Sequence, residues 1–333
     1  MQSKLNMQLE GLRGLTIIFI VLYHVFCRYL QIYCDKDIVF MNRWGRIGVA
    51  IFLVVSGYLM GIKPHKKSSS YLSYIVSKIA RLWPCYIVSI TFIFVITNIF
   101  YLPYRTVSLF EYFINVCFVN GYIGMPYVDG AHWYLTVLLS SHLVYGIIRK
   151  FDEKYILYVC TGWMIIVGLL HVLKFGIFEM ALGGSYVGYI CVGIALGKFV
   201  RFEKKERLKI ILFLMESMFF VYALMGIEDF IELLLIILLV GAVIYRKLKI
   251  LEKKVFTYLG KISYPLYLIH QNIAYLIIYY MSIYFGEYNY WFSIISIGIV
   301  LLLAIILYNF VERPAQAFIG SKLHRVHIEK DGV

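Results

Sequence analysis

Arg13 and His24, on the first apolar segment of the chain, are the two residues whose types and spacing best suit chemistry. Eleven residues separate them, and at about 100° per residue this places both on one face of a helix, about 16 Å apart along its axis. A guanidinium binds phosphate, and an imidazole can act as a general base near neutral pH. One helix face would therefore hold the anionic head of a long substrate and act on its far end, and acyl-CoA has that shape. The alternative is a snorkelling arginine and a histidine bonded to a neighbouring helix.

Three further charged residues are placed to assist Arg13. Glu10 lies three residues earlier, which is close enough to hold the guanidinium in place. Lys78 and Arg81 share one helix face at the end of a basic inner loop that runs from Lys63 to Arg81. Together with Arg13 they suit a phosphate site, and the alternative is the positive charge that loops on the cytoplasmic side of a membrane carry in general.

The remaining candidates lie near the ends of other apolar segments. His132 and Trp133 occur at the predicted outer end of the fourth one, where an aromatic ring beside a histidine can stack on a sugar and hydrogen-bond to it. For the adjacent Tyr134 an aromatic belt at the membrane interface is the better interpretation. His270 lies one to two turns inside the ninth segment. Glu312 ends the last one, where it could pair with a basic inner loop or form a purely structural ion pair.

The composition limits the class of protein. The 333 residues are 62% hydrophobic and only 15% charged, against about 25% in a typical soluble domain, and the mean hydropathy is +0.79. A soluble core of this length could not bury so much apolar surface, which excludes a soluble enzyme and indicates an all-α, polytopic membrane bundle. The net charge of +13 then indicates basic cytoplasmic loops, not a nucleic-acid partner. The six cysteines lack metal-ligand spacing, no other metal constellation occurs, and we assign His142 and His171 to packing.

Ten apolar segments are predicted to cross the membrane. With both termini in the cytoplasm, 26 of the 32 Lys and Arg residues fall on the inner side and 6 on the outer, as the positive-inside rule requires. The polar stretch 104–132 predicts an interfacial helix and an outer loop that can fold back into the bundle, and the glycine-rich segment 183–199 favours close packing. The predicted spans are about 14–33, 46–62, 84–101, 133–148, 155–173, 183–199, 210–227, 230–245, 264–285 and 291–311.

Six motifs, in order along nearly the whole chain, resemble those of the acyltransferase type 3 family of membrane proteins. Each is weak alone, but the ordered set is specific. The motifs are LEGLRGLTIIFIVLYH (9–24), AIFLVVSGYLMG (50–61), SKIARLWPCY (77–86), HWYL (132–135), GKISYPLYLIH (260–270) and VERP (311–314).

The resemblance implies an enzyme of the inner or plasma membrane that moves an acyl group, most often acetyl, from cytoplasmic acyl-CoA to a hydroxyl of an extracytoplasmic or lipid-linked glycan. The arginine and histidine of the family map to Arg13 and His24, and its inner-loop arginine maps to Arg81. Lys78 stands where arginine is more usual. We expect one membrane domain over residues 1–333, without the periplasmic hydrolase-like domain that some members carry. The expected partners are acyl-CoA, the glycan and membrane lipid, and a homo-oligomer is left open.

The sequence thus predicts an O-acyltransferase, with acetyl-CoA as co-substrate, no metal, and a cell-surface polysaccharide or its lipid-linked precursor as acceptor. Transfer directly to the hydroxyl and transfer through an acylated histidine both remain open. So do a succinyl donor and a small lipid or antibiotic-like acceptor. The alternative from another class is a transporter or flippase, because intramembrane histidine and arginine also suit a proton-coupled carrier. The predicted site residues are His24 and Arg13 for catalysis, Arg13, Arg81 and Lys78 for the donor, and His132, Trp133 and His270 for the acceptor.

Overall fold

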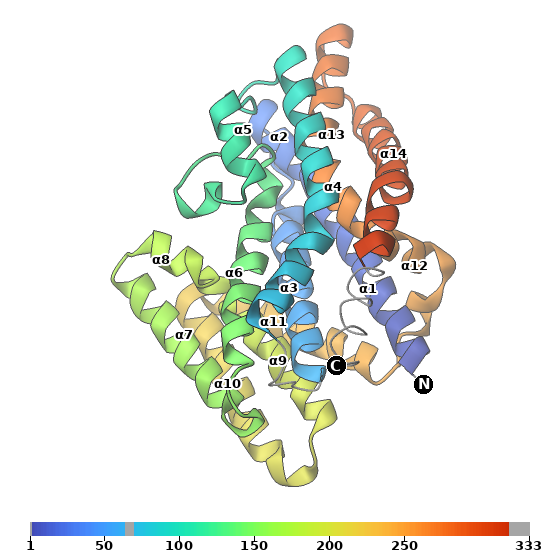
Figure 1. Cartoon of the computed structure of the whole chain (residues 1–333). Coiled ribbons are helices and arrows are strands. Elements are labelled where there is room, and N and C mark those ends of the chain that lie inside the picture. The colour runs from blue at the N-terminus through green and yellow to red at the C-terminus, as the bar shows by residue number, and fades with distance from the viewer. Residues whose placement is uncertain (1, 64–69, 320–333) are drawn as a thin grey trace.

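The computed structural model describes residues 2–63 and 70–319, which form a bundle of helices without a strand in that part of the chain. The predicted all-α class is therefore confirmed. Residues 64–69 of the predicted basic inner loop lie outside the described residues. The helices, drawn in Figure 1, are α1 (Gln2–Leu22), α2 (Tyr29–Tyr33), α3 (Trp44–Ile62), α4 (Tyr71–Ile99), α5 (Leu109–Val116), α6 (Trp133–Ile148), α7 (Ile156–Val172), α8 (Gly176–Ala181), α9 (Val187–Arg201), α10 (Arg207–Met225), α11 (Ile227–Ile244), α12 (Lys254–Lys261), α13 (Ser263–Phe285) and α14 (Tyr290–Leu307).

Eight helical stretches of the described chain are long and apolar enough to cross a membrane. They are Met7–Tyr33, Val39–Ile62, Tyr71–Ile99, Gly130–Ile148, Glu153–Val172, Gly176–Arg201, Lys204–Met225 and Tyr290–Ile319. The protein is thus a multi-pass membrane protein. The other two predicted spans are the helices α11, which has Glu228 and Asp229 in its first turn, and α13, which carries buried His270, Gln271 and Asn272. For these two, a full crossing stays a prediction.

Two helices begin well before the predicted segments. α1 starts at Gln2 and not near residue 14, and α4 starts at Tyr71 and not at Pro84. α4 runs through Pro84, which removes one backbone hydrogen bond but is tolerated in membrane helices. Lys78 and Arg81 therefore lie on one helix, as their spacing predicts, and the inner loop ends before Tyr71.

Backbones touch where α3 and α9 cross, as the glycine-rich sequence predicts. A Cβ atom added at Gly57 would collide with the carbonyl oxygen of Ile190, and one added at Gly193 would collide with that of Val54. Only glycine allows this approach, which is a common way for helices to associate in lipid. The neighbouring helices α1, α10 and α11 pack against this pair.

The polar stretch between α4 and α6 contains a short helix and a loop that folds back into the bundle, as predicted. Ser108 and Glu111 form a capping box at the start of α5. In the loop, the Tyr122 hydroxyl bonds with Ser140 Oγ at 2.8 Å, and the Tyr127 hydroxyl bonds with Thr136 Oγ1 at 3.0 Å. Burial raises the pKa of both phenols, so that they remain neutral hydrogen-bonding groups.

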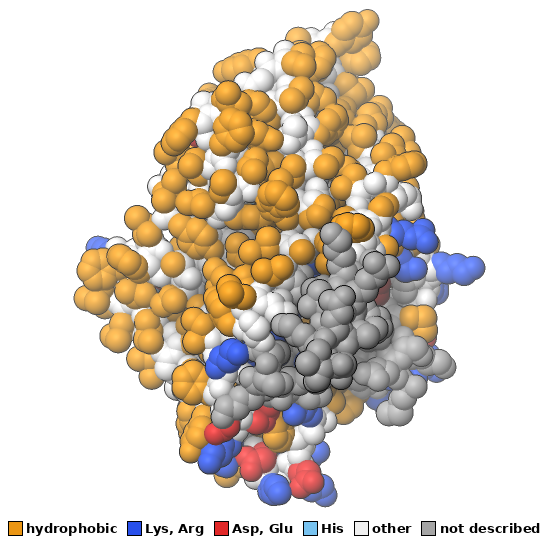
Figure 2. All heavy atoms as spheres, in the orientation of Figure 1, with side chains coloured by type: hydrophobic (Ala, Val, Ile, Leu, Met, Phe, Trp, Pro, Cys, Tyr) orange, Lys and Arg blue, Asp and Glu red, His pale blue; other side chains and the backbone are white. Residues whose placement is uncertain are grey.

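The acidic start of α11 neutralises two of the basic residues that the sequence places outside. Asp229 has a side chain only 1% exposed and accepts from Arg43 at 3.0 Å and from Arg46 at 2.8 Å. Arg43 also pairs with Glu228 and Glu232. These pairs offset the charge of two of the four Lys and Arg residues between Arg28 and Arg46. Elsewhere, many of the visible Lys and Arg side chains gather in the lower half of Figure 2, near the end where α1 begins, while hydrophobic side chains cover the upper part.

Candidate active site

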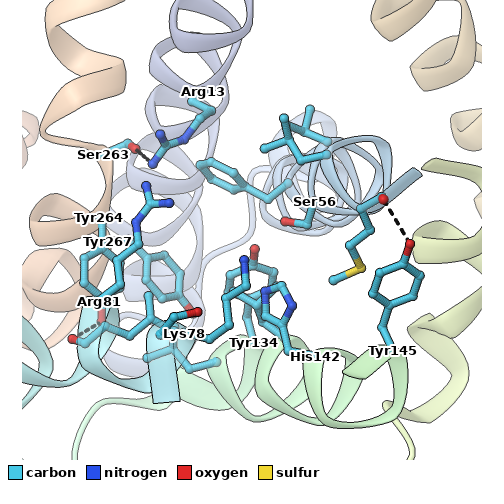
Figure 3. Close-up of a pocket in the computed structure, with 18 of the residues that line it drawn as sticks. Arg13, Ser56, Lys78, Arg81, Tyr134, His142, Tyr145, Ser263, Tyr264 and Tyr267 are labelled. Atoms are coloured by element: carbon cyan, nitrogen blue, oxygen red, sulfur yellow. Dashed lines mark hydrogen bonds between the residues drawn. The ribbon is translucent and has the colours of Figure 1, made fainter. Parts of the chain in front are cut away.

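A cavity of about 440 Å³ opens among α1, α3, α4, α6 and α13, at the end of the bundle where the basic residues gather. Its lining is unbalanced in charge, because five described cations face one described carboxylate, that of Glu312. The cations are Arg13, Lys63, Lys78, Arg81 and Arg149. Figure 3 shows Arg13 of α1 and Lys78 and Arg81 of α4 around this space, together with Ser56 and Tyr134. A space of this kind suits a ligand with several negative charges.

Two side chains hold Arg13 at the cavity, and a glycine makes one of these contacts possible. A Cβ atom on Gly260 of α12 would collide with the carbonyl oxygen of Glu10, so the glycine lets α12 lie directly against α1. This brings Ser263, three residues later, to Arg13, whose Nη2 donates to Ser263 Oγ at 3.0 Å. On its other side Arg13 forms an ion pair with Glu10 at 3.3 Å, as the spacing predicts. Arg13 lies in the interior of α1, so it is not a helix-end residue that snorkels to the membrane surface.

Lys78 and Arg81 both line the cavity, but their surroundings differ. Lys78 is half-buried, with its Nζ 5.2 Å from the ring centroid of Tyr74, and the guanidinium of Arg149 lies 4.5 Å from the same ring. Arg81 is exposed and forms no ion pair among the described residues. The Tyr74 hydroxyl also bonds with His142 Nδ1 at 2.9 Å. His142 therefore lines the cavity, and its assignment to packing was incomplete. His171, the other residue assigned to packing, is hydrogen-bonded to Glu179 at 3.1 Å.

Glu312 lies in a π-helical turn, Tyr308–Glu312, that follows α14. Its side chain is buried and lines the cavity with Arg13 and Arg81. One carboxylate oxygen accepts from Gln316 at 2.8 Å, and the other is buried without a hydrogen-bond partner. The ion pair expected from the sequence does not form among the described residues, so the carboxylate is left facing the cavity cations.

His24 lies outside the cavity lining, in a second polar cluster deeper in the bundle. The helix is π-helical over Tyr23–Arg28, and such turns are frequent at functional sites. The Nδ1 atom of His24 bonds with the Tyr275 hydroxyl at 3.3 Å, which leaves Nε2 without a hydrogen bond to any described residue. The ring of His270 lies 4.9 Å away. His270 donates from Nδ1 to the Tyr267 carbonyl at 2.7 Å, and its Nε2 is buried without a partner.

The cavity and the histidine cluster meet at aromatic rings. Tyr134 and Tyr267 line the cavity with ring centroids 5.6 Å apart, and the Tyr267 ring lies 5.7 Å from that of His270. Tyr134 is thus buried in the bundle, and its interpretation as a membrane-belt residue is wrong. Tyr267 therefore lies between the cavity and His270, which in turn lies beside His24.

The structure separates the two predicted acceptor residues His132 and Trp133. His132 is fully buried, and its Nε2 donates to the Leu268 carbonyl at 2.9 Å, so its ring lies against α13 and not at an open mouth. Trp133 is half-buried and packs its ring 4.9 Å from that of Tyr186. His132 belongs to the histidine cluster, and Trp133 faces a different part of the bundle.

Sequence reasoning missed Ser263, Tyr267, Tyr275 and Arg105 as residues of the site. Ser263 and Tyr267 lie within the GKISYPLYLIH motif, so their place in a motif was the available signal. Arg105 is the one basic residue in the predicted outer loop 104–132, and an isolated cation on that side of the membrane was its signal. The sequence does not show which residues these four contact, because the contacts join helices that only the fold brings together.

The fold and the site together define a multi-pass membrane protein with a cationic cavity close to a pair of histidines inside the bundle. The chain belongs to the acyltransferase type 3 family, because the acyltransferase domain that defines the family matches residues 6–309. The resemblance predicted from the six motifs is thereby confirmed, and the protein is a membrane acyltransferase. No match was found among curated proteins or among solved structures.

Proposed function

We propose that the protein transfers an acetyl group from cytoplasmic acetyl-CoA to a hydroxyl of a cell-surface polysaccharide or lipid-linked glycan. The observation that supports this proposal best is the cavity, in which five described cations face one described carboxylate and whose lining residue Tyr267 lies beside His270. The head group of acetyl-CoA carries several phosphates, which guanidinium and ammonium groups bind.

The donor would enter from the cytoplasmic end with its phosphates on Arg13, Arg81 and Lys78. Ser263 and Glu10 hold Arg13 in place, which reduces the entropy lost when the phosphate binds. The thioester would then extend past Tyr134 and Tyr267 towards the histidines.

His24 would act as the general base through Nε2. In the tautomer that donates from Nδ1 to the Tyr275 hydroxyl, Nε2 has a free lone pair. The acceptor oxygen attacks the thioester carbonyl while Nε2 takes the hydroxyl proton. When the intermediate collapses, the carbon–sulfur bond breaks and the proton passes from the imidazolium to the CoA thiolate. The products are the acetylated acceptor and the CoA thiol, His24 is neutral again, and the reaction requires no metal.

The test is transfer of radiolabelled acetyl from acetyl-CoA to a surface-glycan fraction, with purified protein in nanodiscs and free CoA thiol as the second readout. We expect label in the glycan, and we expect His24→Gln to lower transfer by about 10²-fold or more while acetyl-CoA still binds. His171→Gln, on the distant α7, is the matched control and should retain activity. Absence of label from every glycan fraction, or an active His24→Gln enzyme, would overturn this assignment.

A further inference from the structure

Arg105, in the loop between α4 and α5, reaches from the predicted outer side into the histidine cluster. Its guanidinium lies 5.4 Å from the ring centroid of Tyr275, the residue whose hydroxyl bonds with His24. Gly130 makes room for it, because a Cβ atom at that position would lie 2.7 Å from Arg105 Nη1 and 3.3 Å from Gln271 Oε1. The side chains of Arg105 and Gln271 therefore lie together beside Gly130, in the space that a larger residue at this position would fill.

No carboxylate neutralises Arg105 within ion-pair distance among the described residues. Glu111 is the nearest acidic residue in the sequence, and it forms the capping box with Ser108. Asp129 precedes Gly130, and backbone amides donate to both of its oxygens: Ala131 to Oδ1 at 2.9 Å and Asn272 to Oδ2 at 2.9 Å. The Nε atom of Arg105 is buried without a hydrogen-bond partner, and so is Gln271 Oε1. Arg43, by contrast, pairs with three carboxylates.

A half-buried guanidinium without an acidic partner lacks the anion that would offset its desolvation. The donor cannot supply that anion in the proposed mechanism, because its phosphates remain at the opposite end of the site with Arg13. The position beside Tyr275 and His24 is the one that the acceptor would occupy. The missing anion would then be part of the acceptor.

We propose that Arg105 binds an anionic oxyacid group of the acceptor, a sugar carboxylate or a phosphate, and thereby places a neighbouring hydroxyl at His24. The planar guanidinium matches either group with two parallel hydrogen bonds, and Gln271 Oε1 accepts from a sugar hydroxyl. This inference rests on the proposed function and narrows it, because it makes the acceptor an acidic glycan or a glycan phosphate.

The test is direct binding of glucuronate, glucose 1-phosphate and glucose to the purified protein in nanodiscs, measured by calorimetry without acetyl-CoA. We expect the wild-type protein to bind one or both anions at least tenfold more tightly than glucose. Arg105→Gln should remove that preference, as the loss of a charge-assisted pair requires. Tighter binding of glucuronate identifies a carboxylate, and tighter binding of glucose 1-phosphate identifies a phosphate.

Two further variants complete the experiment, one as a second test of Arg105 and one as a control. Gly130→Ala retains the charge but places a methyl group against Arg105 Nη1, so it should also reduce the preference, even if Arg105→Gln does not fold. Lys36→Gln removes one exposed charge from the same side and should change nothing. Equal binding of glucose and the anions, or a preference that survives Gly130→Ala and Arg105→Gln, would refute the inference. Selective anion binding without acetyl transfer would refute only the proposed function.

Discussion

Replacement of Arg81 by glutamine should weaken acetyl-CoA binding and leave the fold intact. Arg81 is exposed at the cavity and forms no ion pair among the described residues, so its removal breaks no such contact that stabilises the bundle. A hydrogen bond to a charged group contributes about 1.5–3 kcal/mol, whereas an ion pair in water contributes about 0–1 kcal/mol. Because Arg81 is exposed but shares one cavity with four other described cations, we take about 1.5 kcal/mol. This corresponds to a rise of about tenfold in Kd.

The measurement is the Kd for acetyl-CoA, by calorimetry on protein in nanodiscs at two salt concentrations. Salt screens exposed charges over about 10 Å at 0.1 M, so the difference between wild type and variant should shrink as salt rises. Arg81→Lys keeps the charge and should recover part of the affinity. Lys254→Gln removes an exposed charge from α12 that does not line the cavity. Equal losses in Arg81→Gln and Lys254→Gln would show that net charge alone attracts the donor, and an unchanged Kd in Arg81→Gln would remove Arg81 from the site.

Three further outcomes are expected. The side chain in Gly193→Val would collide with the Val54 carbonyl and force α3 and α9 apart, so little folded protein should elute on size exclusion. Gly162→Val, at a position on α7 with open space around it, should behave as wild type. Asp229→Asn breaks a buried ion pair, so it should lower the free energy of denaturant unfolding by about 3 kcal/mol. Glu228 has a side chain that is 71% exposed, so Glu228→Gln should lower that free energy by less than about 1 kcal/mol. A cysteine introduced at Lys204 should resist labelling from outside intact cells and one at Lys36 should label, and the opposite pattern would reverse the predicted topology.

The sequence was sufficient for the parts of the fold that depend on local pattern. Apolar segments predicted the bundle, and the spacing of Glu10 and Arg13 predicted their ion pair. The glycines of 183–199 predicted close helix packing, although not that α3 is the partner. The folded-back loop was also predictable, because its polar residues could not face lipid. Each of these predictions depends either on the spacing of residues within one segment or on the composition of that segment.

The composition of the site depended on contacts between helices that are distant in sequence. Spacing placed Arg13 and His24 on one helix face, but it could not show the π-helical turn at Tyr23–Arg28 that carries His24. Periodicity does not fix how a helix is rotated in the bundle, so Tyr134 and His142 could not be recognised as cavity residues. Helix starts were predicted late for α1 and α4 because hydrophobicity marks the membrane core and not the ends of helices that project beyond it.

The distribution of unpaired polar atoms extends the argument for where the proposed acceptor binds. Five of the thirteen buried side-chain atoms that lack a partner in the described part of the chain belong to Arg105, His132, His270, Gln271 and Asn272. Each such atom costs about 1–3 kcal/mol, and in the membrane core no bulk water offsets that cost. Three of these residues are consecutive on α13, where apolar side chains would pack at lower cost. These residues lie between the cationic cavity and the predicted outer side, where the proposed hydroxylated acceptor would supply the missing donors and acceptors. The free energy of those hydrogen bonds would then add to the affinity for the acceptor.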